Sequence, residues 1–171
     1  MAKTRPFNII TVSEIEKINN MKKSILCSGM DANEVQQLAP SFSAYSVDGG
    51  AEIYQEGDTE AFLCLIASGT VNIYKNYRQH NQKLLSTLGD GETVGEMAVI
   101  DERPRSASAV APSKAIFYAL TRRNLNELLL NTPTIWGKLI FNISALLCNR
   151  LRYTNDMLAK VLPSTPFEQT E

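Results

Sequence analysis

Hydrophobic residues recur at three- and four-residue steps near the beginning of the chain, which is the period of an amphipathic helix. The recurring positions are Ile15, Ile18, Met21 and Ile25. A second short helix is expected between Asp31, which can cap it, and Leu38, because Pro40 follows. The pattern therefore predicts an N-terminal helical segment over residues 1–41.

The pattern changes between residues 42 and 121, where short apolar runs rich in Val, Ile, Tyr and Phe replace the helical period. Turn-forming residues separate these runs at Gly49-Gly50, Gly57-Asp58, Ser68-Gly69, Gly89-Asp90-Gly91 and Pro112-Ser113. Short β-prone runs with turns at this frequency are typical of antiparallel sandwiches and barrels. We therefore predict an α+β fold that is mainly β, an antiparallel jelly-roll flanked by N-terminal helices and a long C-terminal helix.

The helical period returns after residue 121, and two helices are expected over residues 122–162. The first, rich in leucine, should end near Pro133, because the residue before a proline disfavours helical geometry. The second should run from Pro133 to Leu162, and it is too long for one small sandwich to cover. Packing on the sandwich and homodimerisation are both open for its apolar face. The proline-containing tail, residues 163–171, is expected to be flexible.

The charge balance and the lengths of the apolar runs limit the classes of function that the chain can have. The 171 residues include 17 Lys and Arg against 18 Asp and Glu, so no overall basic field attracts nucleic acid or an anionic membrane. No apolar run approaches the roughly 20 residues of a membrane span, and no signal-peptide pattern opens the chain. We therefore expect neither direct nucleic-acid binding nor membrane insertion.

The cysteine and histidine content narrows it further. Cys27, Cys64 and Cys148 lie far apart, which favours reduced thiols and a cytoplasmic location over disulfides or a metal site. The single histidine, His80, lies in a polar loop, whereas metalloenzymes on similar β-folds need clustered ligands. Because no nucleophile–base pair or P-loop is evident either, we expect no metal, no catalytic residues and no enzymatic activity.

The segment from Val94 to Ser108 carries the clearest chemistry, with the sequence V-G-E-M-A-V-I-D-E-R-P-R-S-A-S. Gly95 allows the backbone to approach a bound anion closely. The residues after it can form one helical turn, whose free N–H groups would point toward that anion. The start of this segment therefore suggests an anion-binding turn.

Arg105 and Glu96 have opposite chemistry and suit different parts of one ligand. Arg105, stiffened by Pro104, can supply two parallel donors to a phosphodiester, and Ser106 can add a hydroxyl donor. Glu96 can accept a hydrogen bond from a sugar 2′-OH and would repel a phosphate at that position. A surface ion pair between Glu96 and Arg105, worth about 0–1 kcal/mol, is the alternative. Otherwise, the ligand should have one negative phosphate and one free ribose hydroxyl.

These residues resemble the phosphate-binding cassette of the cyclic nucleotide-binding domain family, whose pattern is roughly F-G-E-x-A-x, a variable loop and P-R-S/T/A-A. The matching positions are Gly95, Glu96, Ala98, Pro104, Arg105, Ser106 and Ala107. Val94 replaces the usual Phe. The strand-and-turn signatures of the family are also matched upstream, at residues 50–58 and 65–74, and the resemblance extends over residues 42–162.

The resemblance implies a role for each cassette residue. Gly95 and Ala98 would contribute backbone donors, Glu96 would hold the ribose 2′-OH, and Arg105 with Ser106 would hold the cyclic phosphate. The ligand-binding residues expected in this way are Gly95, Glu96, Met97, Ala98, Arg105, Ser106, Ala107, Thr154 and Asn155.

The pair Arg105-Ser106 also resembles the bacterial catabolite activator proteins, which are cAMP receptors that dimerise through a long helix. Their helix carries Arg-Leu-x-x-Thr-Ser, and this chain has Arg-Leu-x-x-Thr-Asn at residues 150–155. Thr154 matches, whereas Asn155 replaces the serine. The resemblance therefore favours cAMP and leaves cGMP possible. It implies a helix-turn-helix domain after the long helix, for which this sequence leaves no room unless it is a fragment.

Three functions are compatible with this cassette and this fold. The first is a receptor module in which a cyclic nucleotide shifts the C-terminal helix and so signals to a separate, unknown effector protein. The second is a degenerate domain that kept the fold and now acts as a protein-interaction scaffold. The third is the sensor half of a transcription regulator, if the chain is a fragment.

Overall fold

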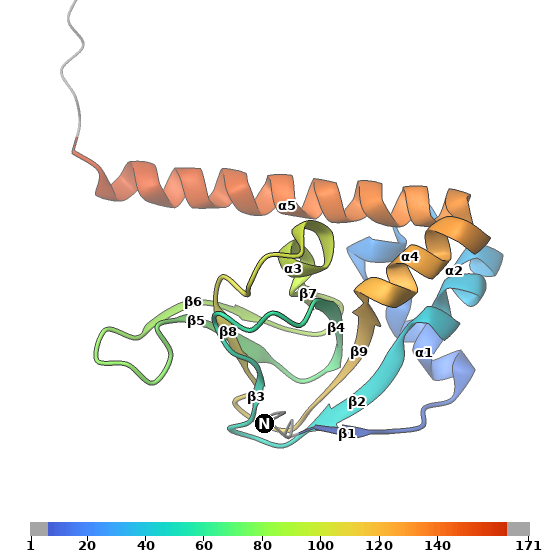
Figure 1. The fold of residues 1–171 in the computed structure, drawn as a ribbon, viewed down its shortest axis with the longest axis horizontal. Helices are drawn as coiled ribbons and strands as arrows, with labels where there is room; N and C mark the ends of the chain where they lie inside the picture. Colours follow the sequence, from blue (N-terminus) through green and yellow to red (C-terminus); the bar gives the residue numbers. More distant parts are fainter. Residues whose placement is uncertain (1–6, 164–171) are drawn as a thin grey trace, which may run out of the picture.

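The computed structural model describes residues 7–163, and their strands form two antiparallel sheets (Figure 1). One sheet has the order β1 (Phe7–Ile9), β2 (Ser43–Val47), β9 (Ala115–Thr121), β4 (Phe62–Ser68), β7 (Thr93–Val94). The other has the order β3 (Glu52–Tyr54), β8 (Ser108–Val110), β5 (Val71–Lys75), β6 (Lys83–Leu88). The predicted mainly β fold with a long C-terminal helix is confirmed.

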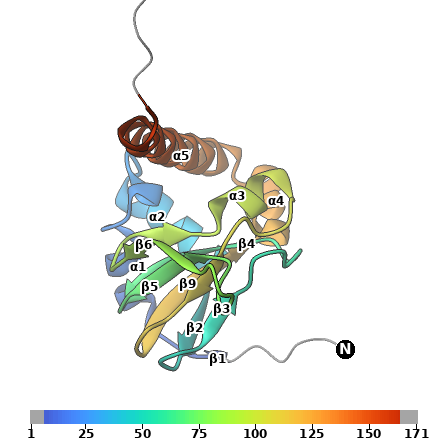
Figure 2. The same cartoon turned by 90° about the vertical axis from the view of Figure 1, so that its left-hand side faces the viewer.

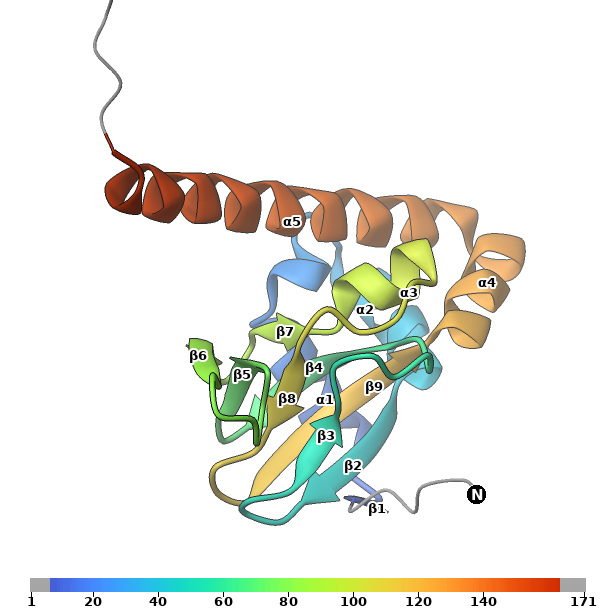
Figure 3. The same ribbon diagram turned by 60° about the vertical axis from the view of Figure 1, so that its left-hand side comes forward.

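Strand β4 shows why its sequence is apolar without alternation. Leu63 and Leu65 belong to a hydrophobic cluster that the larger sheet shares with the helices. Cys64 and Ile66 belong to a second cluster that lies between the two sheets. Because successive side chains point to opposite faces, a strand covered on both faces is apolar throughout. The larger sheet is therefore the central layer of the molecule (Figure 3).

The N-terminal segment differs from the helical prediction at two places. Strand β1 pairs with β2, from Phe7 opposite Val47 to Ile9 opposite Tyr45, although residues 1–41 were predicted to be helical. The first helix ends before Ile25, which lies in a separate 3₁₀ turn capped by Ser24. A strand of three residues is too short to show alternation, so its sequence carried no signal.

The helices of this segment have clear capping signals. They are α1 (Glu14–Met21), η1 (Ile25–Cys27), α2 (Ala32–Leu38) and η2 (Ala39–Ser41). Asp31 accepts from the Glu34 amide and Glu34 accepts from the Asp31 amide, which together form a capping box at the start of α2. The predicted cap at Asp31 is confirmed.

Three further helices pack on the face of the larger sheet that the N-terminal helices also cover. They are α3 (Glu96–Asp101), α4 (Arg122–Asn131) and α5 (Pro133–Val161). Helix α5 crosses one end of the molecule, and α3 lies between it and the sheets (Figures 1 and 2). The first half of α5 packs through Ile135, Leu139 and Ile143. Within residues 7–163, no helix has the length and apolar character to cross a bilayer. Apart from Pro163, the predicted tail lies outside the described residues.

Candidate functional site

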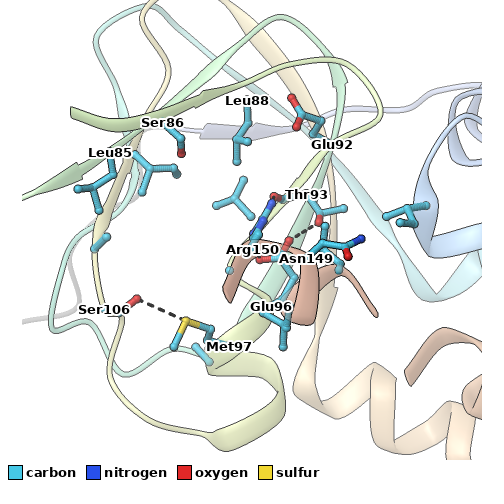
Figure 4. Close-up of a pocket in the computed structure, with 18 of the residues that line it drawn as sticks. Leu85, Ser86, Leu88, Glu92, Thr93, Glu96, Met97, Ser106, Asn149 and Arg150 are labelled. Carbon is cyan, nitrogen blue, oxygen red and sulfur yellow. Dashed lines mark hydrogen bonds and ion pairs between the residues drawn. The ribbon is translucent and has the colours of Figure 1, made fainter. Parts of the chain in front are cut away.

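A cavity of about 1340 Å³ opens between β6, α3 and α5. Its walls combine one apolar side with several charged groups (Figure 4). The apolar residues include Ile73, Leu85, Leu88, Met97, Leu147 and Leu151. The charged residues that the following paragraphs discuss are Glu96, Arg105 and Arg150. A concave, largely apolar site with a few converging polar groups is typical of small-molecule binding.

Gly95 begins the turn into α3 with φ of 89°, in the left-handed region. A Cβ atom there would lie 2.5 Å from Arg105 Nη1 and 2.6 Å from the Phe62 carbonyl oxygen. Both the backbone geometry and the lack of space therefore require glycine. This close approach lets α3 start beside the guanidinium of Arg105.

Arg105 is buried, with 4% of its surface exposed, yet its side chain lines the cavity. Its Nη1 donates to the Gly95 carbonyl at 3.1 Å, and its Nη2 donates to the Phe62 carbonyl at 2.7 Å. The guanidinium also lies over the rings of Tyr54, at 4.0 Å, and Phe62, at 4.4 Å. Such contacts fix the plane of the guanidinium before any ligand arrives.

Arg105 forms no ion pair at contact distance in the described part of the chain. Its Nε atom is buried without a hydrogen-bond partner among residues 7–163. Burial lowers the pKa of Arg105, although an arginine remains protonated in proteins. Of its five N–H donors, two bond to the carbonyls of Gly95 and Phe62.

Glu96, the first residue of α3, is 2% exposed and is held on both sides. One carboxylate oxygen accepts from the Thr93 hydroxyl. The other forms an ion pair with Arg150 Nη1 at 2.8 Å, and Arg150 Nη2 donates to the Thr93 carbonyl at 2.6 Å. Arg150 therefore joins α5 to the start of α3 (Figure 4).

The role of Arg150 was not predicted from the sequence. Arg150 lies 54 residues from Glu96, so no local pattern connects them. Its place at the head of the Arg-Leu-x-x-Thr match at residues 150–154 was the available signal. Thr93 was missed for a simpler reason, since it stands just before the segment that carries the motif.

The nine residues expected to bind the ligand fall into two groups. Except for Asn155, all of them line the same cavity: Gly95, Glu96, Met97, Ala98, Arg105, Ser106, Ala107 and Thr154. Thr154 Oγ1 donates to the Arg150 carbonyl at 2.8 Å, one turn earlier on α5. The structure does not bring Asn155 to the cavity.

The loop segment that contains Arg105, between α3 and β8, is supported from behind by the turn at residues 55–58. The Arg105 amide donates to the Asp58 carbonyl at 2.8 Å, and the Gly57 amide donates to the Arg105 carbonyl at 2.9 Å. Lys75 Nζ donates to the Ser106 carbonyl at 2.8 Å and pairs with Glu56. The hydrogen bond from Lys75 lowers the pKa of Glu56. The backbone of the cassette is thus fixed independently of any ligand.

Two antiparallel sheets with a buried arginine at a cavity under a long helix are features that suit a small anionic ligand. Residues 46–132 match the family described as "Cyclic nucleotide-binding domain", and the chain belongs to this family. The predicted family is therefore confirmed.

The chain is similar to regulatory proteins and to a solved domain. It is 36% identical over 132 residues to the "Cyclic AMP receptor protein" of Thermus thermophilus, covering 77% of this chain and 59% of the relative. It is 31% identical over 126 residues to the "cAMP-dependent protein kinase regulatory subunit" of Candida albicans, covering 73% of this chain and 26% of the relative.

A solved cyclic nucleotide-binding domain from Methylobacillus flagellatus superposes with a TM-score of 0.81 at 29% identity. This superposition covers 94% of the chain and 93% of the solved domain. The chain thus spans less than two thirds of the Thermus relative and about a quarter of the Candida relative, but nearly all of this domain.

Proposed function

We propose that this chain is a non-catalytic receptor for a cyclic nucleotide, with cAMP preferred over cGMP. The observation that carries the proposal is the buried guanidinium of Arg105, which faces the cavity without a carboxylate partner among residues 7–163. Burying a charge is costly unless an opposite charge or hydrogen bonds compensate for it. A phosphate supplies both, because its oxygens can accept from the remaining guanidinium donors.

The other ends of the ligand have suitable groups nearby. Ser106, which follows Arg105, would donate its hydroxyl to the phosphate, and the amides at the start of α3 would point at the same oxygens. Glu96 would accept from the ribose 2′-OH. The apolar wall of the cavity would cover the base, with Thr154 at its rim. The relatives named as a cyclic AMP receptor and a cAMP-dependent kinase subunit support a preference for cAMP over cGMP.

Ligand binding would act on α5 through Arg150. The carboxylate of Glu96 that we assign to the ribose already binds Arg150 and Thr93. A ribose hydroxyl must therefore share or displace these contacts, which changes how firmly α5 is held. We propose that this change signals to a separate effector protein. The shift in the helix equilibrium cannot exceed the difference in ligand affinity between the two positions of the helix.

The exposed face of α5 supports a homodimer in which a second copy packs along this helix. A stripe of positions at alternating steps of three and four residues runs along it, and all of them are exposed. The stripe consists of Gly137, Phe141, Ser144, Cys148, Leu151, Asn155 and Leu158, and Leu162 continues it just past the end of α5. A polar residue such as Asn155 within such a stripe commonly specifies the register and number of helices.

Calorimetric titration with cAMP and then cGMP tests the receptor proposal. The chain is first unfolded and refolded, so that no ligand carried through purification remains. We expect micromolar or tighter binding, about −8 kcal/mol or better. Arg105→Ala should weaken binding by about 2–3 kcal/mol, because charge-assisted bonds to the phosphate are lost.

Two further variants make this test specific. Arg103→Ala removes an exposed arginine from the same loop and should bind like the natural chain. Ser106→Ala keeps Arg105 in place and should give an intermediate loss. Absence of heat with both nucleotides would contradict the proposal and favour the scaffold function. Equal loss in Arg103→Ala and Arg105→Ala would contradict the assignment of the phosphate to Arg105.

A further inference from the structure

Met97 occupies an unusual position for a methionine. It is the second residue of α3, 52% of its surface is exposed, and it lines the cavity. Its sulfur lies 3.8 Å from the hydroxyl oxygen of Ser106, which donates a hydrogen bond to it (Figure 4). The side chain of Met97 therefore contacts the hydroxyl that the proposed function assigns to the ligand phosphate.

The other methionines of the described chain lie elsewhere. Met21 is fully buried in the helical cluster, and Met30 is partly buried against it. Met157 is 46% exposed, close to the value of Met97, but it lies on α5 and does not line the cavity. Accessibility governs which methionines are oxidised, so Met97 and Met157 are the two accessible candidates among residues 7–163.

We propose that Met97 is a reversible oxidation site that controls nucleotide affinity, an inference that rests on the proposed function. A hydroperoxide transfers one oxygen atom to the thioether sulfur. The O–O bond breaks as the S–O bond forms, the sulfur loses two electrons, and the peroxide is reduced to water or an alcohol. Methionine sulfoxide reductases reverse this change.

Oxidation changes the hydrogen-bonding chemistry next to Ser106. A thioether is a weak acceptor, which a phosphate can easily displace, whereas a sulfoxide is polar and accepts strongly. The Ser106 hydroxyl has one proton to donate, so a bond to the sulfoxide removes it from the phosphate. The added oxygen also places a second acceptor near the site of a negatively charged ligand. Both effects weaken binding, by about tenfold or more.

The test compares nucleotide affinity before and after hydrogen peroxide treatment in the full chain carrying Cys148→Ser. That substitution removes the exposed thiol, whereas Cys27 and Cys64 are buried. Mass spectrometry measures sulfoxide formation at each methionine, and calorimetry measures the dissociation constant for cAMP. The same measurements are made on Met97→Leu and Met157→Leu, each compared with its own untreated sample.

We expect oxidation to weaken cAMP binding about tenfold or more in the parent chain, which carries Cys148→Ser alone, and in Met157→Leu. Binding by Met97→Leu should stay within about twofold of its untreated value, and reductase treatment should restore the parent chain. Unchanged affinity after complete oxidation of Met97, or an equal loss in Met97→Leu, overturns the inference alone. An untreated parent chain that binds neither cAMP nor cGMP overturns the proposed function and this inference with it.

Discussion

Helix α5 has two halves with opposite surroundings. In the first half, Ile135, Leu139 and Ile143 are at most 4% exposed and belong to the hydrophobic cluster between the larger sheet and the helices. In the second half, every residue from Leu151 to Val161 is exposed. Arg150 lies at the boundary and contacts Thr93 and Glu96.

The polar contacts divide in the same way. In the first half, Asn142 donates to the carbonyls of Leu26 and Ser28, each at 2.9 Å. Lys138 pairs with Glu34 at 2.7 Å. These bonds join α5 to the N-terminal segment, so the two should move together. Among residues 7–163, the side-chain hydrogen bonds that join the outer part of α5 to another element are those of Arg150, and a ligand at Glu96 would act at that boundary. The difference therefore places the proposed movement in the outer half of the helix.

The largest expected loss of stability comes from truncating a leucine in the first half of α5, and the same change in the second half is its control. Leu139→Ala should lower the free energy of unfolding by about 2–5 kcal/mol, because Leu139 is fully buried and its loss leaves a cavity. Leu158→Ala, at a position 50% exposed, should cost less than about 0.5 kcal/mol in dilute solution. Urea unfolding measures both. Equal costs would show that the outer half is packed as firmly as the inner half.

Protein concentration separates packing within one chain from packing between two copies. If a second copy covers the outer stripe, the parent chain should become more stable as concentration rises, and Leu158→Ala should lose part of that gain. The cost of Leu139→Ala should not depend on concentration. Unfolding of the parent and Leu158→Ala chains that is identical at every concentration would contradict the homodimer.

A smaller effect is expected from Arg150→Gln, which acts at the boundary itself. Glu96 would keep its buried carboxylate but lose its ion pair, so the free energy of unfolding should fall by about 1–3 kcal/mol. Amide hydrogen exchange should increase in the outer half of α5 and stay unchanged around Leu139. Arg152→Gln, two residues further along and exposed, is the matched control. The same loss in both variants would mean that the bond to Glu96 does not hold the helix.

The sequence indicated this arrangement only in part. The apolar runs of β4 and the period of α5 could be interpreted because each pattern is local and long enough to repeat. The cassette could be located because Gly95, Glu96 and Arg105 stand at characteristic spacings. Strand β1 could not be predicted, since its three residues are too few to show alternation. Nor could the division of α5, because its apolar period continues through both halves.

Individual side chains were the hardest to place. The pairing of Arg150 with Glu96 depends on how α5 lies over α3, which no spacing within the chain encodes. The expected position of Asn155 came from matching a sequence pattern in register. On the helix it lies on the exposed stripe, four residues after Leu151, and it does not line the cavity. Local patterns therefore identified the cassette, whereas the contacts between elements required the structure.

The smallest expected effect concerns the bond between Lys138 and Glu34, which helps to hold the inner half. The hydrogen bond from Lys138 is the main reason why the pKa of Glu34 is below its ordinary value of 4.5. A carboxyl whose pKa is lowered by folding stabilises the protein above that ordinary value. The stabilisation is lost as the pH falls through the lowered pKa of the folded state. Glu34→Gln should therefore be less stable than the parent chain near neutral pH, and the difference should shrink in acid.

Urea unfolding from about pH 7 down to about pH 3 measures this difference. Glutamine can still accept from the Asp31 amide, so the variant tests the charge and largely keeps the capping box. In a Lys138→Met background the same substitution should have less effect at every pH, because the partner charge is absent. A difference that stays constant as the pH falls would contradict a stabilising role for the charge of Glu34. The inner half of α5 would then be held by Asn142 and by apolar packing, without help from the ion pair.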